Sequence, residues 1–426
     1  MIRATETSEP RRPAARMVAG LAAFAAILAV VVKGIVFPHG SINNDEGIYR
    51  LQAQTLQHGH LFTPALAPTA AFRPWLAALV GHHWVLKYVP VEAALLAVAG
   101  MVTGTASAAL PVIAAAGVAA TWLLMRELLE DTTSALVATA LVALAPLMIV
   151  QSGLLVGYLP TLVLLEVFAW SVLRTVRQPR ATWCVAGGVA AGVAGVARPY
   201  DTLLFALPLL VFAAVRLGRR LARPVWWYLV GALPPLAAML VYDWAATGSA
   251  LRLPFNLFEP ADRPGFGLRR MYSQEQLHAF GWRLGLRGSS DHLLLTVLWV
   301  AGGPTLVLLA VIGVWRRRRS GASLALAATA LTFPIGYVFF WGAWNASRLW
   351  HGVHYLGPFY FLPMVVAIAA FGGAELVSLY RRWRPLAAAV ALVGVASSAV
   401  VVAPAMAADA RWSRQDGAVL AAVDRV

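Results

Sequence analysis

The chain alternates between long apolar segments and shorter polar connections, and this succession constrains its fold more than any other feature. Hydrophobic residues make up 60% of the 426 residues, charged residues 12%, and the mean hydropathy is +0.70. A water-soluble domain of this size could not cover so much apolar surface. We therefore expect an all-α polytopic membrane protein with about eleven transmembrane helices, each able to cross ~30 Å of hydrocarbon. The expected spans lie near residues 17–37, 106–125, 133–151, 157–173, 181–197, 200–215, 225–246, 293–315, 322–342, 352–376 and 385–407.

The formal net charge of +15 is high enough to suggest a nucleic-acid-binding protein, but the positions of the arginines argue against one. They gather where apolar segments end, in every second connection, which is the positive-inside pattern of membrane proteins. The N-terminus is therefore expected in the cytoplasm, and no nucleic acid is expected as a partner. The clusters are Arg11, Arg12 and Arg16; Arg174, Arg177 and Arg180; Arg216, Arg219, Arg220 and Arg223; Arg316 to Arg319; and Arg381, Arg382 and Arg384.

This orientation divides the chain into a cytoplasmic tail at 1–16, a transmembrane domain at 17–407 and an outward-facing tail at 408–426. The first apolar segment is longer than the core of a typical signal peptide, so we interpret it as an uncleaved span. The abundance of Ala, Arg and Val is typical of a bacterium with a GC-rich genome. We expect a multi-pass protein of the bacterial cytoplasmic (inner) membrane, surrounded by membrane lipids.

Two outward connections are long, at residues 38–105 and 247–292, whereas the inner connections are short and carry little but arginine. Functional residues concentrate on loops, so any chemistry is expected on the outer face, toward the periplasm or the exterior. Residues 89–104 are apolar but short, and counting them as a span would invert the later arginine clusters. We expect a re-entrant or interfacial helix there.

Two adjacent carboxylates, Asp45 and Glu46, follow the first apolar segment in the stretch GSINNDEGIYRLQAQTL. In a structural interpretation, Asn44 or Asp45 caps a helix that runs to about Gln57. Glu46 and Arg50 are then i, i+4 partners on that helix. In a functional interpretation, Asp45 is a general base toward a hydroxyl, or both carboxylates hold a divalent cation. The residues alone leave these alternatives open.

Six stretches carry a resemblance to a known family when they are taken together. They are NNDEGIYRLQAQTL, FRPWLAAL, WVLKYVPVEAALLAVAG, ARPYDTLLFALP, LPFNLFEPADRPGFG and YLGPFYFLP. Their order and spacing resemble bacterial relatives of the protein O-mannosyltransferases and the lipid A aminoarabinose transferases. These are membrane glycosyltransferases of the GT-C superfamily that use polyprenyl-phosphate sugars. The similarity covers most of residues 17–380.

By this resemblance, Asp45 is the catalytic base, Glu46 is an orienting or metal-coupled partner, and Tyr49 belongs to the same motif. The implied enzyme is a hexosyl- or pentosyltransferase that inverts the anomeric centre in one displacement. Its implied partners are a polyprenyl-phosphate-linked sugar donor and a lipid, glycan or protein acceptor. A divalent metal ion is the one cofactor that we consider.

The donor's leaving group is a phosphate monoester on a lipid, which departs without a general acid. The enzyme must supply a base, alignment of the reactants, and positive charge where the phosphate departs. Each basic candidate has an alternative role: Lys87 can snorkel, Arg198 can pair with Asp201, and Arg73 can bind lipid headgroups. The candidates for phosphate binding are Arg50, Arg73, Lys87, Tyr88, Arg198 and Arg348.

The stretch RLWHGVHY places His351 and His354 three residues apart, which predicts that they share one face of the helix that begins the 352–376 span. Two histidines are too few for a metal site unless Asp45 or Glu46 joins them. Hydrogen bonding at a cavity rim is the favoured role. The residues that we assign to a substrate cavity are Tyr49, Asp201, His351, His354 and Tyr355.

Two other classes of protein compete with a glycosyltransferase. A transporter or lipid flippase needs charges along a transmembrane path, whereas most acidic residues avoid the expected spans. Glu166 is an exception, and we expect it to face the bundle interior with a polar partner. In a non-catalytic assembly subunit, neutralising Asp45 and Glu46 together would leave activity in the host unchanged.

Overall fold

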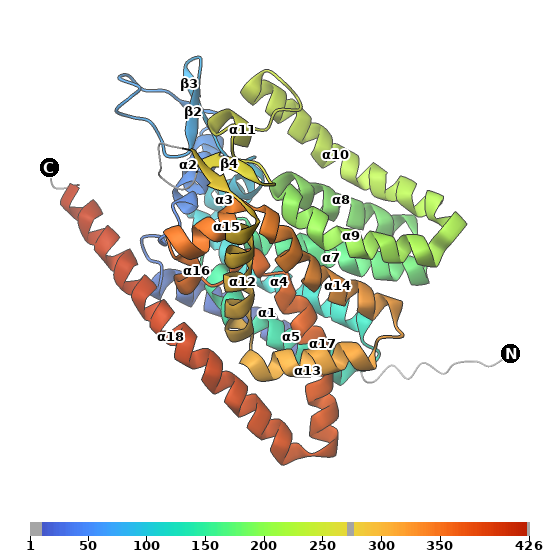
Figure 1. Ribbon diagram of the computed structural model, residues 1–426. Coiled ribbons are helices and arrows are strands. Elements are labelled where there is room, and N and C mark those ends of the chain that lie inside the picture. The colour runs from blue at the N-terminus through green and yellow to red at the C-terminus, as the bar shows by residue number, and fades with distance from the viewer. Residues whose placement is uncertain (1–10, 271–276, 424–426) are drawn as a thin grey trace.

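The apolar segments form helices because a backbone in hydrocarbon must satisfy its own hydrogen bonds. The computed structural model describes residues 11–270 and 277–423 of the protein, drawn as a ribbon in Figure 1. The helices of the bundle are α1 (Arg11–Ile35), α4 (Ala109–Leu128), α5 (Thr132–Ala143), α6 (Pro146–Ser152), α7 (Tyr158–Arg177), α8 (Ala181–Ala197), α9 (Pro199–Leu217), α10 (Ala222–Thr247), α12 (Trp282–Trp299), α13 (Gly303–Arg316), α14 (Gly321–Gly336), α17 (Met364–Arg382) and α18 (Arg384–Val423).

Short elements connect these helices. Short α-helices are α2 (Asp45–Gln57), α3 (Val91–Thr103), α11 (Pro254–Phe258), α15 (Trp341–Trp344) and α16 (Gly352–Tyr355). Single turns of other helix types are η1 (Ala106–Ala108), η2 (Gly218–Leu221), η3 (Tyr337–Phe339), η4 (Asn345–Leu349) and η5 (Phe359–Phe361). The strands are β1 (Thr63–Pro64), β2 (Ala77–Val80), β3 (His83–Leu86), β4 (Gly267–Arg270) and β5 (Leu277–Phe280).

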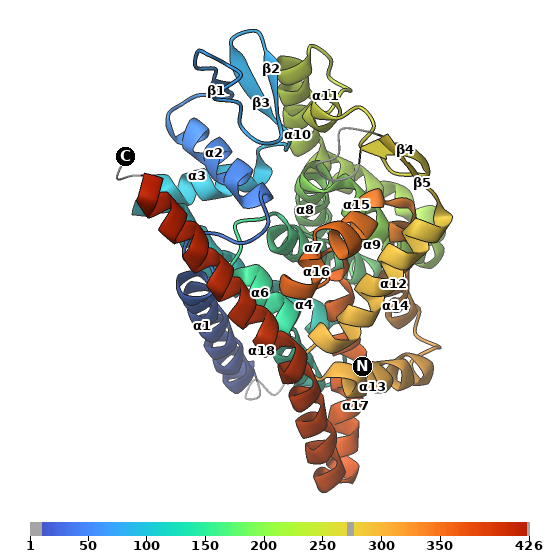
Figure 2. The same cartoon turned by 60° about the vertical axis from the view of Figure 1, so that its left-hand side comes forward.

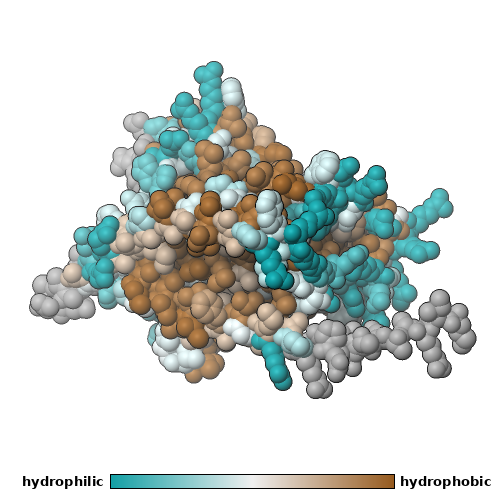
Figure 3. Space-filling view, turned by 90° about the horizontal axis from the view of Figure 1, so that it is seen from below, coloured by the Kyte–Doolittle hydropathy of each residue, from teal (hydrophilic) through white to brown (hydrophobic). Residues whose placement is uncertain are grey.

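The expected fold class, an all-α polytopic membrane protein, is confirmed. Within the described residues, seven helical segments are long and apolar enough to cross a membrane, or up to nine if each of two bent pairs is one span. The expected count was about eleven. The difference arises at α8, which has only 17 residues, and at α9 and α10, which form one continuous segment, Pro199–Thr247. Figure 3 shows a broad apolar face with hydrophilic side chains gathered toward its edges.

Three of the expected spans are broken in the structure. The segment 133–151 is divided into α5 and α6, which meet at a bend of 55°. The segment 293–315 is not one helix, because α12 and α13 meet at a bend of 100°. Gly303 has φ = +51° there and Pro304 follows it, so the chain turns instead of continuing α12. The segment 352–376 is also interrupted: α17 begins only at Met364, after Gly357 with φ = +75°.

Glycines allow α8 and α10 to pack closely. A Cβ on Gly188 would lie 2.2 Å from the backbone oxygen of Tyr228, and one on Gly231 would lie 2.3 Å from the backbone oxygen of Val185. Neither distance is possible for a real side chain, so both positions require glycine. Small residues play this role widely between membrane helices, where close backbone approach supplies the packing energy.

Ion pairs join helix ends that carry three of the arginine clusters. These pairs are Glu127 with Arg174 and Arg177, Glu375 with Arg316 and Arg317, and Asp131 with Arg381. They place the C-terminal ends of α4, α7, α13 and α17 and the N-terminal end of α5 at one end of the bundle. The clusters at 174–177, 316–317 and 381 therefore lie at a common end, the arrangement on which the expected orientation depends.

The two long loops meet at another end of the molecule (Figure 1). The 38–105 loop contains α2, the antiparallel sheet of order β1-β3-β2, and α3. The apolar 89–104 segment forms the 13-residue helix α3, which packs on α2, where Gln57 Nε2 donates to the Ala97 oxygen at 3.3 Å. The 247–292 loop contributes α11, the β4–β5 hairpin and the first turns of α12.

The last helix runs diagonally across the bundle (Figure 2). It continues beyond residue 407, where the last span was expected to end, and reaches Val423. Near its far end, Ser413 Oγ accepts a hydrogen bond from the backbone N–H of His39 at 3.0 Å. The C-terminal part of α18 is thereby fixed to the start of the 38–105 loop.

Candidate active site

The helix α2 carries the acidic pair, and it extends to Gln57 as predicted. Its first turn holds Asp45 and Glu46, where negative charge is favourable near the helix N-terminus. The predicted cap was wrong, however. Neither Asn44 nor Asp45 caps the helix with its side chain, and instead Asn43 Oδ1 accepts the backbone N–H of Asp45 at 3.1 Å.

Glu46 is buried and holds two backbone segments together. Its carboxylate accepts the N–H of Ser41 at 2.6 Å and the N–H of Leu155 at 2.8 Å. The predicted pair with Arg50 is absent from the ion pairs of the described residues, because Glu46 turns inward whereas Arg50 is exposed. Glu46 thus ties the start of the 38–105 loop to the turn between α6 and α7.

Asp45 points to a different environment from its neighbour. It is half-buried and hydrogen-bonds Tyr88, and Lys87, Arg198 and Asp262 all act on it electrostatically. Burial raises the pKa of the Asp45 carboxyl, while Lys87, the Tyr88 hydrogen bond and Arg198 oppose that rise. Burial also raises the pKa of Tyr88, so this phenol remains a hydrogen-bond donor. The arrangement gives a carboxylate that can accept a proton.

Two tyrosines form a wall beside Asp45. Tyr49, one turn further along α2, stacks on Tyr88 with ring centroids 4.9 Å apart. A third tyrosine, Tyr158 at the start of α7, lies next to them, with its ring centroid 4.0 Å from the guanidinium carbon of Arg198. Flat aromatic surfaces of this kind suit the binding of a sugar ring.

Lys87 follows β3 directly, and its backbone N–H donates to the oxygen of Leu76 at 3.0 Å. Its Nζ forms an ion pair with Asp262 at 3.1 Å and lies 4.3 Å from the ring centroid of Phe255. The snorkelling alternative is therefore not what the structure shows. Lys87 instead joins the 38–105 loop to the 247–292 loop, close to Asp45.

Arg198 lies in the turn between α8 and α9 and pairs with Asp201, as one sequence alternative proposed. Asp201 also accepts a hydrogen bond from Tyr337. The guanidinium carbon of Arg198 lies 4.0 Å from the ring centroid of Tyr158 and 5.9 Å from that of Tyr360. Asp201 and the two rings fix a cation that acts on Asp45.

The other predicted phosphate ligands lie outside this cluster. Arg50 is exposed, Arg73 donates to the Ala77 oxygen at 3.3 Å, and Arg348 pairs with Asp291 at 2.7 Å. Of the six candidates, the structure brings only Lys87, Tyr88 and Arg198 to Asp45.

The predicted helix face shared by His351 and His354 is wrong. His351 has φ = +56° and precedes the one-turn helix α16, which contains His354 and Tyr355. Burial lowers the pKa of His354, and the charged groups that act on it are Asp291 and Arg348 together with His351. Asp291, Arg348, His351 and His354 therefore form a cluster of their own, separate from the Asp45 cluster.

Sequence reasoning assigned no role to Asp262 or Tyr158, and it counted Trp341 among the outer-face aromatics that form an interfacial belt or stack on sugars. Asp262 lies within the stretch LPFNLFEPADRPGFG, whose resemblance was noted without a role for its carboxylate. Tyr158 and Trp341 appear in the sequence as ordinary interfacial aromatics. The ion pair with Lys87 and the hydrogen bond from Trp341 Nε1 to Asp262 Oδ1 at 2.6 Å reveal their place only in three dimensions.

Among the described residues, no three His, Cys, Asp or Glu side chains lie together in a way that could hold a metal ion. The Asp262 carboxylate, which acts electrostatically on Asp45, accepts hydrogen bonds from Lys87 and Trp341. Glu46 is bonded to backbone N–H groups. The donor set does not fit a protein-held metal.

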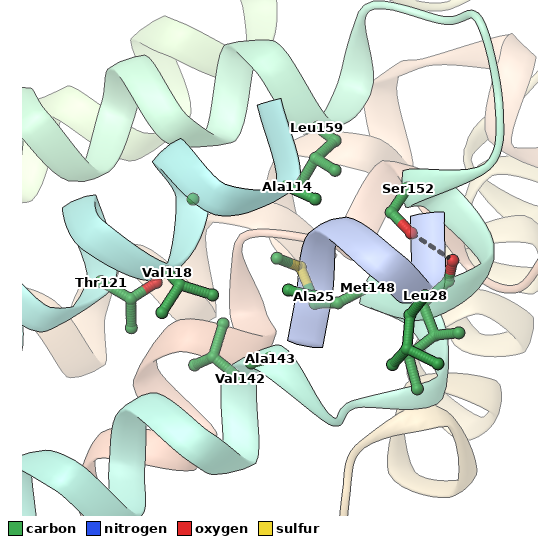
Figure 4. A pocket seen from close by; sticks show the side chains of 12 residues that line it. Ala25, Leu28, Ala114, Val118, Thr121, Val142, Ala143, Met148, Ser152 and Leu159 are labelled. Carbon is green, nitrogen blue, oxygen red and sulfur yellow. Dashed lines mark hydrogen bonds between the residues drawn. The ribbon is translucent and has the colours of Figure 1, made fainter. Parts of the chain in front are cut away.

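None of the predicted site residues lines either of two cavities in the described part of the bundle. Figure 4 shows the smaller one, about 20 Å³, surrounded by side chains of α1, α4, α5, α6 and α7. The larger one, about 490 Å³ and mainly apolar, lies between α18 and the helices α5, α6, α13 and α17. The candidate site is instead the Asp45 cluster where the two long loops meet.

Solved structures of two proteins resemble this one. ArnT from Cupriavidus metallidurans bound to undecaprenyl phosphate has 16% identity and a TM-score of 0.57, covering 90% of this chain. The archaeal oligosaccharyltransferase AglB from Archaeoglobus fulgidus, in complex with an inhibitory peptide and a dolichol-phosphate, has 12% identity and a TM-score of 0.52, covering 92% of this chain. The chain spans 65% of the ArnT chain and 56% of the AglB chain.

No protein-family model and no curated relative matches the sequence. The resemblance is therefore one of architecture, and it extends over nine-tenths of the chain in both comparisons. The chain shares the fold of these two proteins.

Proposed function

We propose that the protein is a glycosyltransferase that moves a sugar from a polyprenyl-phosphate carrier to a hydroxyl acceptor. One observation carries the proposal: a half-buried carboxylate, Asp45, shares a cluster with the cations Lys87 and Arg198 in a chain of GT-C fold. The structures that share this fold were solved with undecaprenyl phosphate and dolichol-phosphate, which are lipid phosphates of the proposed donor's kind.

Asp45 is the general base of the proposed reaction. The acceptor oxygen attacks the anomeric carbon of the donor sugar, and its proton passes to the Asp45 carboxylate. The bond between the anomeric carbon and the phosphate oxygen breaks, and its electron pair remains on the lipid phosphate. Attack opposite the leaving group in one displacement inverts the anomeric centre. The raised pKa of Asp45 makes its carboxylate a stronger base than that of an ordinary aspartate.

Lys87 and Arg198 supply positive charge for the departing phosphate. Fixed cations in a partly buried site stabilise developing negative charge without reorganising when the bond breaks. Arg198 is fixed by Asp201 and by the ring of Tyr158, and Lys87 is fixed at the end of β3. Tyr49 and Tyr88 form the flat surface against which the sugar is placed.

We place this site on the periplasmic or outer face of a bacterial cytoplasmic membrane, because the arginine-rich helix ends lie at a different end of the bundle from the site. The transferred group is a hexosyl or pentosyl residue, and the acceptor is a lipid, glycan or protein hydroxyl. A transporter would need charged groups inside the bundle. Glu166 is such a group, and its side chain accepts a hydrogen bond from Thr121 at 2.8 Å. Isolated buried carboxyls such as Glu166 do not make a transport path.

The test uses membranes containing the wild type, Asp45→Asn or Asp291→Asn, incubated with a panel of radiolabelled polyprenyl-phosphate sugars. We expect label to leave one donor with the wild type and to remain on it with Asp45→Asn. Asp291→Asn is the matched control, because it removes an aspartate of the separate Arg348 cluster. Release of label by correctly inserted Asp45→Asn at the wild-type rate would overturn the assignment of the base. Retention of every donor by the wild type would favour the transporter.

A further inference from the structure

Lys87, the proposed phosphate ligand, has an anionic partner within the protein. Its Nζ lies 3.1 Å from Asp262 Oδ2, and the side chains are only 11% and 3% exposed, respectively. The other carboxylate oxygen of Asp262 accepts the indole N–H of Trp341 at 2.6 Å. The lysine's charge is thus neutralised by a well-placed, nearly dry carboxylate.

The loop that carries Asp262 is a preformed piece of structure. Arg269 is buried, and its guanidinium donates to the backbone oxygens of five residues of this loop. These oxygens belong to Arg263, Pro264, Gly265, Phe266 and Leu268. Such internal bonding holds the 263–270 loop together as a unit.

Several contacts join this unit to the rest of the protein. Strand β4 pairs with β5 along Gly267–Arg270, Arg270 pairs with Glu259, and Gly265 donates its N–H to the Phe339 oxygen at 2.6 Å. Asp262 adds the contacts to Lys87 and Trp341. Lys87 is anchored through its backbone at the end of β3. The ion pair therefore joins two segments that are each held in place by other contacts.

We propose that Asp262 competes with the donor's phosphate for Lys87, so that phosphate binding breaks the ion pair between Lys87 and Asp262. This inference rests on the proposed function, in which Lys87 binds that phosphate. A phosphate and the Asp262 carboxylate are both anions, so placing both against one ammonium group brings like charges together in a partly buried site. Asp262 or the Lys87 side chain must therefore move when the phosphate enters.

Competition predicts an effect of opposite sign from a scaffolding role. If Asp262 competes, replacing it with asparagine frees Lys87 and strengthens phosphate binding. If Asp262 only holds the site in shape, the same change weakens binding or leaves it unaltered. After the change, Asp45 and the ring of Phe255 still lie near the lysine.

The experiment measures the binding of undecaprenyl phosphate to the purified full chain in lipid nanodiscs. We expect Asp262→Asn to bind about tenfold more tightly than the wild type, because a competing buried charge has been removed. Asp262→Glu, which keeps the charge, should bind like the wild type. Trp341→Phe should shift affinity in the same direction as Asp262→Asn by a smaller factor, since it loosens Asp262 without removing its charge. This variant keeps the test valid if Asp262→Asn does not fold.

Two further variants separate the failure of this inference from failure of the proposed function. Lys87→Gln should lose most of the binding. If it binds like the wild type, Lys87 is no phosphate ligand, and the inference fails with that assignment. If Lys87→Gln binds weakly but Asp262→Asn binds no more tightly than the wild type, only the competition is overturned. Asp291→Asn, at another Arg–Asp pair, should leave binding unchanged.

Discussion

At the scale of single residues, the acidic pair divides two roles between neighbouring carboxylates. Adjacent positions on a helix point about 100° apart, so Asp45 and Glu46 face different surroundings. Asp45 lies beside Tyr88 and acts on the proposed site, whereas Glu46 accepts two backbone N–H groups from distant segments. The sequence predicted the helix and its end at Gln57, but it could not show that Glu46 turns inward.

Neutralising each carboxylate should therefore affect different properties. Glu46→Gln weakens two charge-assisted hydrogen bonds, each of which contributes about 1.5–3 kcal/mol to the free energy of unfolding. We expect a lower melting temperature with turnover retained in the folded fraction. Asp45→Asn should abolish turnover and leave the melting temperature nearly unchanged. Thermal unfolding of both variants in detergent, together with donor turnover, checks the division. The reverse pattern would contradict it.

The pH dependence of turnover should reflect the Asp45 carboxyl. The carboxylate is the active form, so the rate should fall as the pH drops through a pKa raised above the ordinary value of about 4. Lys87 and the Tyr88 hydrogen bond both lower that pKa, so removing either should move the acid limb to higher pH. We expect Lys87→Gln to shift it more than Tyr88→Phe, and kcat/KM profiles of the three proteins test this order. An acid limb that moves to lower pH in Tyr88→Phe would show that another group titrates.

At the scale of secondary structure, hydropathy located the helices but not their breaks. The 13-residue helix α3 was predicted from its length, and the end of α2 was predicted from its polar residues. The 100° bend between α12 and α13 was missed because Gly302, Gly303 and Pro304 lie inside an otherwise apolar segment. In such a segment, composition favours a span while backbone conformation decides where the helix stops.

The α8–α10 contact gives a prediction with a matched control on one helix. Gly188→Ala would place a Cβ 2.2 Å from the Tyr228 backbone oxygen, so the helices must separate. At Gly195 on the same helix, the nearest atom is a Thr202 methyl at 3.9 Å, which is ordinary contact. Alanine is intrinsically better than glycine in a helix by about 1 kcal/mol. We expect Gly188→Ala to lower the melting temperature and Gly195→Ala to maintain or raise it. Equal effects would mean that the two helices are not closely packed.

At the scale of the whole molecule, the candidate site depends on contacts between segments that are far apart in the sequence, and no local sequence pattern predicts such contacts. Asp45, Lys87 and Arg198 were all predicted, because each stands in a stretch with a recognisable resemblance. Asp262 was not given a role, since its contact with Lys87 joins residues 175 positions apart. Arg50, Arg73 and Arg348 were equally plausible from sequence, and only the packing of the two long loops separates them from the Asp45 cluster.

The orientation of the whole bundle is the last prediction. Three arginine clusters lie at one end of the bundle, where they form ion pairs with Glu127, Glu375 and Asp131. By the positive-inside rule, this end faces the cytoplasm. The only cysteine, Cys184, is buried, so a Cys184→Ser background leaves no thiol. In that background, His58→Cys probes the 38–105 loop and Arg319→Cys probes the turn after α13, both at exposed positions.

A membrane-impermeant maleimide should label His58→Cys in intact spheroplasts and Arg319→Cys only after permeabilisation. Donor turnover by each variant provides a control that insertion is unchanged. The opposite labelling pattern would place the Asp45 cluster in the cytoplasm, and the proposed transfer would then occur on the inner face. The site's geometry would be unaffected, because it depends on contacts between loops. Labelling of both cysteines in intact spheroplasts would instead exclude the alternation of spans from which the orientation was predicted.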